Sequence, residues 1–120
     1  MTSCRIAISV DSDDGLDAQV TAHFGRCAYF TIADIQDGKI VSSKSVANPY
    51  YASHQPGQVP AFIASLEADV MLSGGMGGRA IQEFAKSDIE AVTGAAGTAR
   101  EAIEAYLSQS LHGAESCQHH

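Results

Sequence analysis

Polar or small residues alternate with branched aliphatic ones near the start of the chain. The stretch "CRIAISV" (4–10) places Ile6, Ile8 and Val10 on one side and small or charged residues on the other. A period of two residues is typical of a strand, so we predict a strand with one firmly buried face. The polar segment that follows, 11–26, predicts a long loop.

Two further apolar runs are separated by a turn signal. The runs "AYFTIADI" (28–35) and "IVSSKSV" (40–46) flank Asp37-Gly38, a dipeptide favoured in the tight primed turn of a hairpin. We therefore predict an antiparallel hairpin here. A second long loop is expected over 47–58.

The second half of the chain alternates helical and strand patterns. Short apolar runs that end in polar or glycine residues indicate strands, and longer segments with helical spacing indicate helices. Thr98 and Glu101 have the S/T-x-x-E spacing of a capping box, which predicts where the last helix begins. The expected helices cover 61–67, 79–87 and 98–111, and the expected strands cover 68–74 and 89–94.

Connection rules convert this order of elements into a sheet. The first three strands form a meander, so the second runs opposite to its neighbours. A helical crossover returns the fourth strand parallel to the first, and a right-handed crossover places the fifth outside it. We predict an α/β protein with an RNase H-like, three-layer α/β/α architecture and a mixed five-stranded sheet in the order 3-2-1-4-5. One domain is expected over residues 1–110, followed by a flexible Cys/His tail, 111–120.

The charge balance limits the classes of partner. The 120 residues contain 7 Lys and Arg against 14 Asp and Glu, a formal net charge of −7. Nucleic-acid-binding proteins usually present a basic stripe, and the few scattered basic residues of this chain form none. We expect a small molecule, a cation or another protein as the partner, and no nucleic acid.

Cysteine usage and the N-terminal residues indicate the compartment. Cys4, Cys27 and Cys117 are an odd number, and "MTSCRIAISV" lacks the apolar run of a signal peptide. These features predict free thiols in a reducing cytoplasm. The uncharged segment 45–66 contains all three prolines and many polar residues, so no membrane span is expected.

Four unusual segments follow strands whose carboxyl ends lie at one edge of the predicted sheet. They are the loop around position 23 and the segments "NPYYASHQPG" (48–57), "SGGMGGRA" (73–80) and "TGAAGT" (93–98). Ligands of open α/β sheets gather at such an edge. The sequence therefore predicts a binding site there.

The first candidate ligands belong to "HFGRC", residues 23–27. In an extended chain His23 and Cys27 point to one side, and Gly25 lets the backbone fold so that both face one metal. Imidazole and thiolate suit iron–sulfur clusters, zinc or copper. The alternative is that Cys27 is a small buried hydrophobe and His23 a solvated loop residue. His54, in the second long loop, is a third candidate with a surface role as its alternative.

The glycine-rich turn 73–80 lies between a strand and a helix. Backbone N–H groups at the helix start, with the helix dipole, create an anion pocket. Close packing of the turn is the alternative use of its glycines. The candidate cofactor-binding residues are Gly74, Gly75, Gly77 and Gly78.

The last residues form a further cluster of soft ligands. Cys117, His119 and His120 lie within four positions of each other. They are candidate metal ligands, with an idle, mobile tail as the alternative.

Carboxylates after the first strand raise the possibility of an enzyme. A two-metal nuclease of RNase H-like fold would need acidic residues there and on neighbouring strands. The fourth strand ends "MLSGG" and supplies none, so a solvated acidic loop is expected and no catalytic residue is assigned. The carboxylates concerned are Asp11, Asp13, Asp14 and Asp17.

Taken in order along residues 4–108, these pieces resemble the dinitrogenase iron–molybdenum cofactor family, which includes the NifX and NafY carriers, the C-terminal domain of NifB and small stand-alone relatives. The resemblance rests on "RIAISV", "HFGRCAYF", "IADIQDGKI", the "NP" before His54, "DVMLSGGMGGRAI" and "TGAAGTAREAIEAYL". It implies an RNase H-like fold and binding of iron–sulfur or iron–molybdenum cofactors or their precursors, without catalysis. It also implies that His23 and Arg26 belong to the family's H-F-G-R motif, with Arg26 stabilising an anionic cluster.

The sequence departs from the family pattern at three places. Cys27-Ala28 replaces a frequent Ala-Pro, Gly77-Gly78 replaces a frequent Gly-Pro, and only His54 remains of a loop that is often rich in histidine. Cys27 thus adds a thiol that the family pattern does not include.

The function expected from these features is a small cytoplasmic, non-enzymatic protein that binds or carries an iron–sulfur or iron–molybdenum-type cluster or its precursor. A protein that donates or accepts the cluster is an expected partner, and a homodimer sharing one cluster is an open alternative. The competing functions are a metal-free interaction or regulatory module that uses the same edge and, third, a metal-dependent nuclease.

Overall fold

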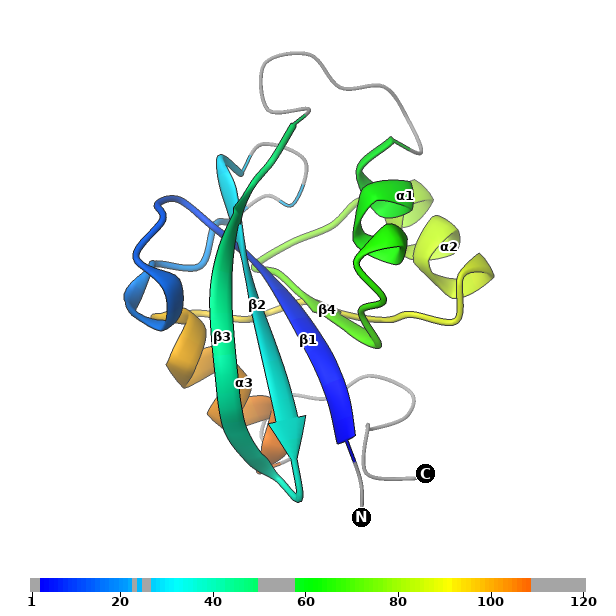
Figure 1. Ribbon diagram of the computed structural model, residues 1–120. Coiled ribbons are helices and arrows are strands. Elements are labelled where there is room, and N and C mark those ends of the chain that lie inside the picture. Colours follow the sequence, from blue (N-terminus) through cyan, green and yellow to red (C-terminus); the bar gives the residue numbers. More distant parts are fainter. Residues whose placement is uncertain (1–2, 23, 25–26, 50–57, 109–120) are drawn as a thin grey trace.

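A single five-stranded sheet runs through the computed structural model, which describes residues 3–22, 24, 27–49 and 58–108 (Figure 1). Three long strands form one side of the sheet, and two short strands form the other. In chain order the elements are β1 (Ser3–Val10), the 3-10 helix η1 (Gly15–Asp17), β2 (Tyr29–Gln36), β3 (Lys39–Ala47), α1 (Gln58–Ser65), β4 (Val70–Leu72), α2 (Gly78–Lys86), β5 (Glu90–Val92) and α3 (Ala99–Leu107).

The strand order is β3-β2-β1-β4-β5, which confirms the predicted topology. β2 is antiparallel to β1 and β3, whereas β4 is parallel to both β1 and β5. In register, Ile6 of β1 pairs with Ala33 of β2 and with Val70 of β4. The carboxyl ends of β1, β4 and β5 therefore lie at one edge, called here the carboxyl edge.

The hairpin turn has the backbone that its sequence predicts. Asp37 and Gly38 both have positive φ angles, 52° and 80°, as a primed two-residue turn requires. A register shift between Asp34 and Ile35 marks a bulge just before the turn.

Helices cover both faces of the sheet, which confirms the three-layer arrangement (Figure 1). On one face, Ile6 and Ile8 pack in a cluster with Ile103 of α3. On the other, Met71 packs in a cluster with Phe84 of α2 and with residues of α1.

The second face of β1 is buried as fully as the first. Ala7 and Ser9 are both 0% exposed, although the alternating pattern predicts only one firmly buried face. The reason is that a strand with helices on both sides has no solvated face.

The main differences from the predicted element boundaries concern one loop, the start of the first helix and the two short strands. The segment 11–26 contains η1 and the isolated bridges Val10–Val20 and Gln19–Thr98. The first helix begins at Gln58 rather than at residue 61, because Pro60 is tolerated in a first turn whose N–H groups need no helical partner. Both β4 and β5 are shorter than their apolar runs. No helix in the described ranges is long and apolar enough to cross a membrane.

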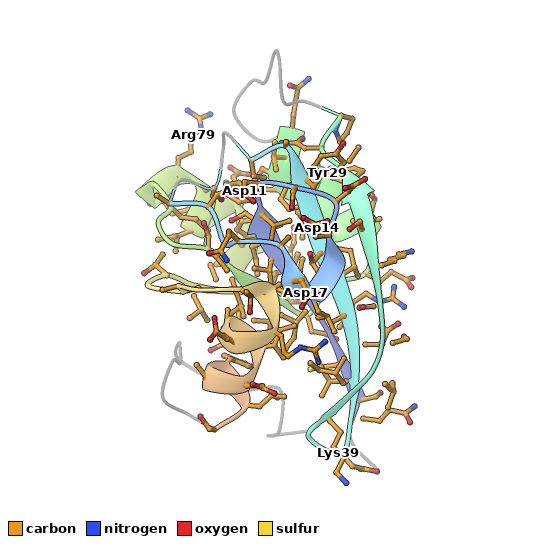
Figure 2. The ribbon with its side chains drawn as sticks, turned by 90° about the vertical axis from the view of Figure 1, so that its left-hand side faces the viewer. Asp11, Asp14, Asp17, Tyr29, Lys39 and Arg79 are labelled. Carbon is orange, nitrogen blue, oxygen red and sulfur yellow. The ribbon has the colours of Figure 1, made fainter. Side chains whose placement is uncertain are left out.

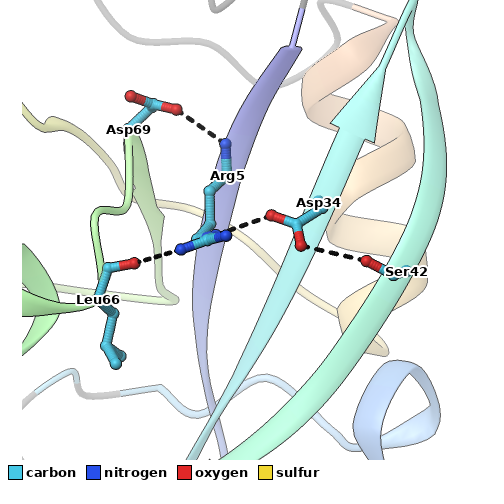
Figure 3. Close-up of polar contacts among 5 residues, drawn as sticks. All are labelled: Arg5, Asp34, Ser42, Leu66 and Asp69. Carbon is cyan, nitrogen blue, oxygen red and sulfur yellow. Dashed lines mark hydrogen bonds and ion pairs between the residues drawn. The ribbon is translucent and has the colours of Figure 1, made fainter.

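The opposite edge of the sheet is held together by an arginine (Figure 3). The Arg5 Nε atom donates to Asp34 Oδ1 at 2.7 Å, and Arg5 Nη1 donates to the Leu66 carbonyl, also at 2.7 Å. Asp34 accepts from Ser42 Oγ, and Asp69 Oδ2 accepts from the Arg5 N–H. The hydrogen bond from Arg5 holds the pKa of Asp34 below its usual value. These bonds tie β1 to the hairpin and to the end of α1, beside an open hollow of about 440 Å³.

Candidate functional site at the carboxyl edge

The loop after η1 crosses the carboxyl edge from one face of the sheet to the other. Ala18 is buried in the cluster on the α3 side, whereas Phe24 is buried in the cluster on the α1 and α2 side. Residues 19–22 lie between these two anchors, and Thr21 N donates to the Ser9 carbonyl at the end of β1. The loop that contains the H-F-G-R motif is therefore anchored in both cores.

Two glycine turns hold this crossing segment by backbone hydrogen bonds. From the turn after β4, Gly74 N donates to the Thr21 carbonyl at 3.0 Å, and the Gly75 carbonyl accepts from Phe24 N at 2.9 Å. From the turn after β5, the Gly97 carbonyl accepts from Val20 N at 2.9 Å. Three of the four segments predicted to converge are thus in contact.

The four predicted glycines of the first turn fall into two pairs. A Cβ atom on Gly74 would lie 2.6 Å from the Thr21 carbonyl oxygen, and one on Gly75 would lie 2.9 Å from the carbonyl oxygen of Ala22. At Gly77 and Gly78, a Cβ atom would have no atom of the described ranges within 4 Å. The first pair packs against the loop, and the second pair faces open space.

The start of α2 lies beside this open space. Gly77 is its N-cap residue, and glycine has no side chain to accept a hydrogen bond from the first N–H groups of the helix. The first N–H groups of a helix have no partner within the helix, so they are available to an anion. Figure 2 shows Arg79 at this helix end, pointing away from the protein.

A chain of hydroxyl groups underlies the crossing loop. Thr21 Oγ1 donates to Ser9 Oγ and Ser9 Oγ donates to Ser73 Oγ, each at 2.9 Å, and Ser73 Oγ donates to the Gly75 carbonyl at 3.1 Å. Ser9 and Ser73 are fully buried. Sequence analysis assigned these residues no role. The available signal was a serine at the end of each of two buried strands.

Phe24 anchors the motif through its aromatic ring. Its ring centroid lies 5.2 Å from that of Phe84 in an edge-to-face arrangement and 6.2 Å from that of Phe30. Such pairs add to the burial of the ring itself. The aromatic residue of the motif is therefore part of the core.

Cys27 lies in the same core. It is 0% exposed, and burial raises the pKa of its thiol to about 12. A thiol binds a metal as a thiolate, so both the burial and the raised pKa favour the alternative in which Cys27 is a small buried hydrophobe.

Asn48 connects this strand entry to the second long loop. Its Nδ2 atom donates to the Cys27 carbonyl at 2.9 Å and lies 3.9 Å from Cys27 Sγ, while its own N–H donates to the Ala28 carbonyl. The start of segment 48–57 is thus tied to the end of the H-F-G-R loop. The "NP" pair drew attention to this residue, but its side-chain role was not predicted.

The remaining predicted ligands lie outside the described residues. These are His23, Arg26, His54, Cys117, His119 and His120. Among the described residues, no group of three His, Cys, Asp or Glu side chains could hold a metal ion. Asp11, Asp14 and Asp17, labelled in Figure 2, are among the described residues, and they form no such group.

The profile of the family described as dinitrogenase iron-molybdenum cofactor matches residues 4–109. The chain belongs to this family. Its motif loop and glycine turn, which meet at the carboxyl edge, both lie within the matched residues. No curated protein matches the chain.

Several solved structures share the fold. The crystal structure of PH0822 is 32% identical, with a TM-score of 0.80, and the match covers 95% of this chain and 99% of that one. The apo form of the orange protein from Desulfovibrio gigas is 28% identical, with a TM-score of 0.81 and 93% of each chain covered. The Thermotoga protein TM1290, at 24% identity, has the same fold, with a TM-score of 0.76 and 92% of each chain covered.

Proposed function

We propose that this protein binds an iron–sulfur or iron–molybdenum-type cluster, or its precursor, at the carboxyl edge and carries it without catalysing a reaction. The observation that supports this most directly is the pair of backbone hydrogen bonds on either side of position 23. Thr21 and Phe24 are both bonded to the glycine turn, beside the uncapped start of α2. Membership of a family named for a cluster, and a similar protein with a structure of its apo form, are consistent with this function.

Different groups take different roles in this proposal. His23 ligates the cargo through its imidazole, and Arg26 balances the negative charge of the cluster. The N–H groups around Gly77 and Gly78 contact the anionic surface of the cargo, because their side of the turn is open.

The second loop and the tail complete the proposed ligand set. His54 follows Asn48, whose side chain fixes the start of that loop beside the motif. Cys117, His119 and His120 add further soft ligands. Cys27 supports the loop from the core and does not ligate the cargo.

The proposed partners follow from the small ligand set. Because a single chain supplies few ligands, the proposal includes a cluster that is shared between two copies or passed to a second protein. A cytoplasmic location is part of the proposal, because Cys4 and Cys27 form no disulfide, as is usual in a reducing compartment.

The test is anaerobic reconstitution of the full chain with ferrous iron and sulfide, followed by absorption spectroscopy and iron analysis. We expect iron and a visible chromophore in the wild type, and loss of both in His23→Ala. Cys27→Ala is the matched control, because it changes a core residue directly after the motif, and it should keep the iron. Circular dichroism establishes that each variant is folded. A wild type without iron, or equal iron in His23→Ala, would overturn the proposal.

A further inference from the structure

In the glycine turn after β4, Gly74 and Gly75 pack against the crossing loop, whereas Gly77 and Gly78 face open space. We propose that Ser73, Gly74 and Gly75, together with Ser9, are positioning residues that fix the H-F-G-R loop over the strand ends. They act on the site through the loop and do not touch the cargo. The positioning itself does not depend on the proposed function. Only its consequence for iron binding rests on that function.

Two backbone hydrogen bonds, called here the clip, join the glycine turn to the loop. The Gly74 N–H donates to the Thr21 carbonyl, and the Phe24 N–H donates to the Gly75 carbonyl. The two hydrogen bonds fall on either side of residues 22 and 23. A shift of the turn therefore moves Thr21 and Phe24, which precede and follow this pair. Ala22 itself lies against both glycines.

Only glycine permits this close approach. A methyl group on residue 74 would lie 2.6 Å from the Thr21 carbonyl oxygen and 2.9 Å from the Ala22 Cα atom, below the 3.0 Å that real Cβ atoms keep. Both neighbours are backbone atoms, which cannot rotate away. A substitution therefore displaces the loop, and ligand sites tolerate a displacement of only about 0.5 Å.

The chain of hydroxyl groups connects the clip to the sheet. Its last acceptor is the Gly75 carbonyl, the same oxygen that accepts from Phe24 N–H. Through Ser9 and Ser73 the loop is thus bonded to the carboxyl ends of both β1 and β4. A fully satisfied buried polar network specifies one arrangement of the segments it joins.

The deciding measurement is amide hydrogen exchange by NMR in the full chain, combined with iron loading. In Gly74→Ala we expect exchange at the Phe24 amide to accelerate by about ten-fold or more while core amides of β1 change little. We expect apparent iron affinity to fall by about 10- to 100-fold, as for other residues that orient metal ligands.

Gly38→Ala is the matched control. Gly38 has a φ of +80° at the far hairpin turn with open space around it, so alanine there lowers stability without reaching the carboxyl edge. It should leave Phe24 exchange, measured relative to the core amides, and iron loading unchanged. If Gly74→Ala does not fold, Ser73→Ala tests the positioning role, because it adds no volume. It should accelerate exchange at the Phe24 amide and leave the core amides of β1 unchanged.

The outcomes separate this inference from the proposed function. Unchanged Phe24 exchange in Gly74→Ala, or in Ser73→Ala if Gly74→Ala does not fold, would overturn the positioning role, as would an equal acceleration in Gly38→Ala. A wild type that takes up no iron would overturn the proposed function but leave the exchange result intact. Altered exchange with normal iron loading would show that the clip holds the loop without serving the site.

Discussion

Two glycine turns at the carboxyl edge look alike in sequence and differ in what they leave open. Both follow a short strand, contact the crossing loop and lead into a helix of nine residues. At the start of α3, Thr98 Oγ1 accepts from Glu101 N and the Glu101 carboxylate accepts from Thr98 N, so the capping box is complete. At the start of α2, Gly77 offers no side chain to do this.

The difference assigns separate tasks to the two turns. The second turn uses its own side chains to satisfy its helix, and Ala99 N donates to the Ala18 carbonyl of the crossing loop. The first turn holds the loop with one pair of glycines and leaves the other pair and the helix N–H groups exposed. A capped helix start supports structure, whereas an uncapped one beside a motif loop can receive a ligand.

The same substitution in the two turns should have very different costs. Gly97 has a φ of +80°, and a methyl group there would meet the Glu101 carboxylate. We expect Gly97→Ala to lower the free energy of unfolding by about 2 kcal/mol, through backbone strain and loss of the cap. Gly77→Ala, with a φ of −72° and open space, should cost about 0.5 kcal/mol. Urea denaturation measures both, and equal costs would contradict the contrast.

Removing the cap of the second turn should have a smaller effect. Thr98→Ala deletes the oxygen that accepts from Glu101 N, and we expect a loss of about 1 kcal/mol. Thr98→Ser keeps an accepting hydroxyl and should lose much less. If serine and alanine are equally destabilising, the hydroxyl is not the source of the cap's stability.

Installing a cap on the first turn should make it resemble the second. Gly77→Ser supplies a hydroxyl at the N-cap of α2, and we expect a gain of about 0.3 kcal/mol in the free energy of unfolding. The same hydroxyl occupies an N–H group that the proposal assigns to the cargo, so iron loading in the reconstitution assay should fall. A variant that is more stable and loads iron as well as the wild type would remove these N–H groups from the site.

Much of the fold is predictable because its signals are local. The alternation in β1, the Asp37-Gly38 turn and the capping box of α3 each depend on a few neighbouring residues, and connection rules then leave one sheet order. The start of α1 was missed because Pro60 in a first turn resembles a helix breaker in sequence.

The candidate site is predictable only in outline, because its parts meet through tertiary contacts. Gly74 and Gly77 are the same residue in one turn, and only the approach of Thr21 to Gly74 distinguishes them. Likewise, the spacing of Cys27 from the histidine is compatible with a ligand, and burial rather than sequence favours a core role. The pattern places Ser9 on the polar side of a strand, and only the structure shows its hydroxyl partner, Ser73, directly after β4.

The bridge between Gln19 and Thr98 has a consequence for when the site forms. The crossing loop is made early in synthesis, but its contacts lie on the turns after β4 and β5, far along the chain. Contacts between such distant residues must wait for loop closure and form late in folding. During synthesis on the ribosome, the motif segment leaves the tunnel long before residues 74, 75 and 97 can hold it. Under the proposed function, cargo loading must therefore follow the synthesis of these two turns, because the motif segment lacks their hydrogen bonds until then.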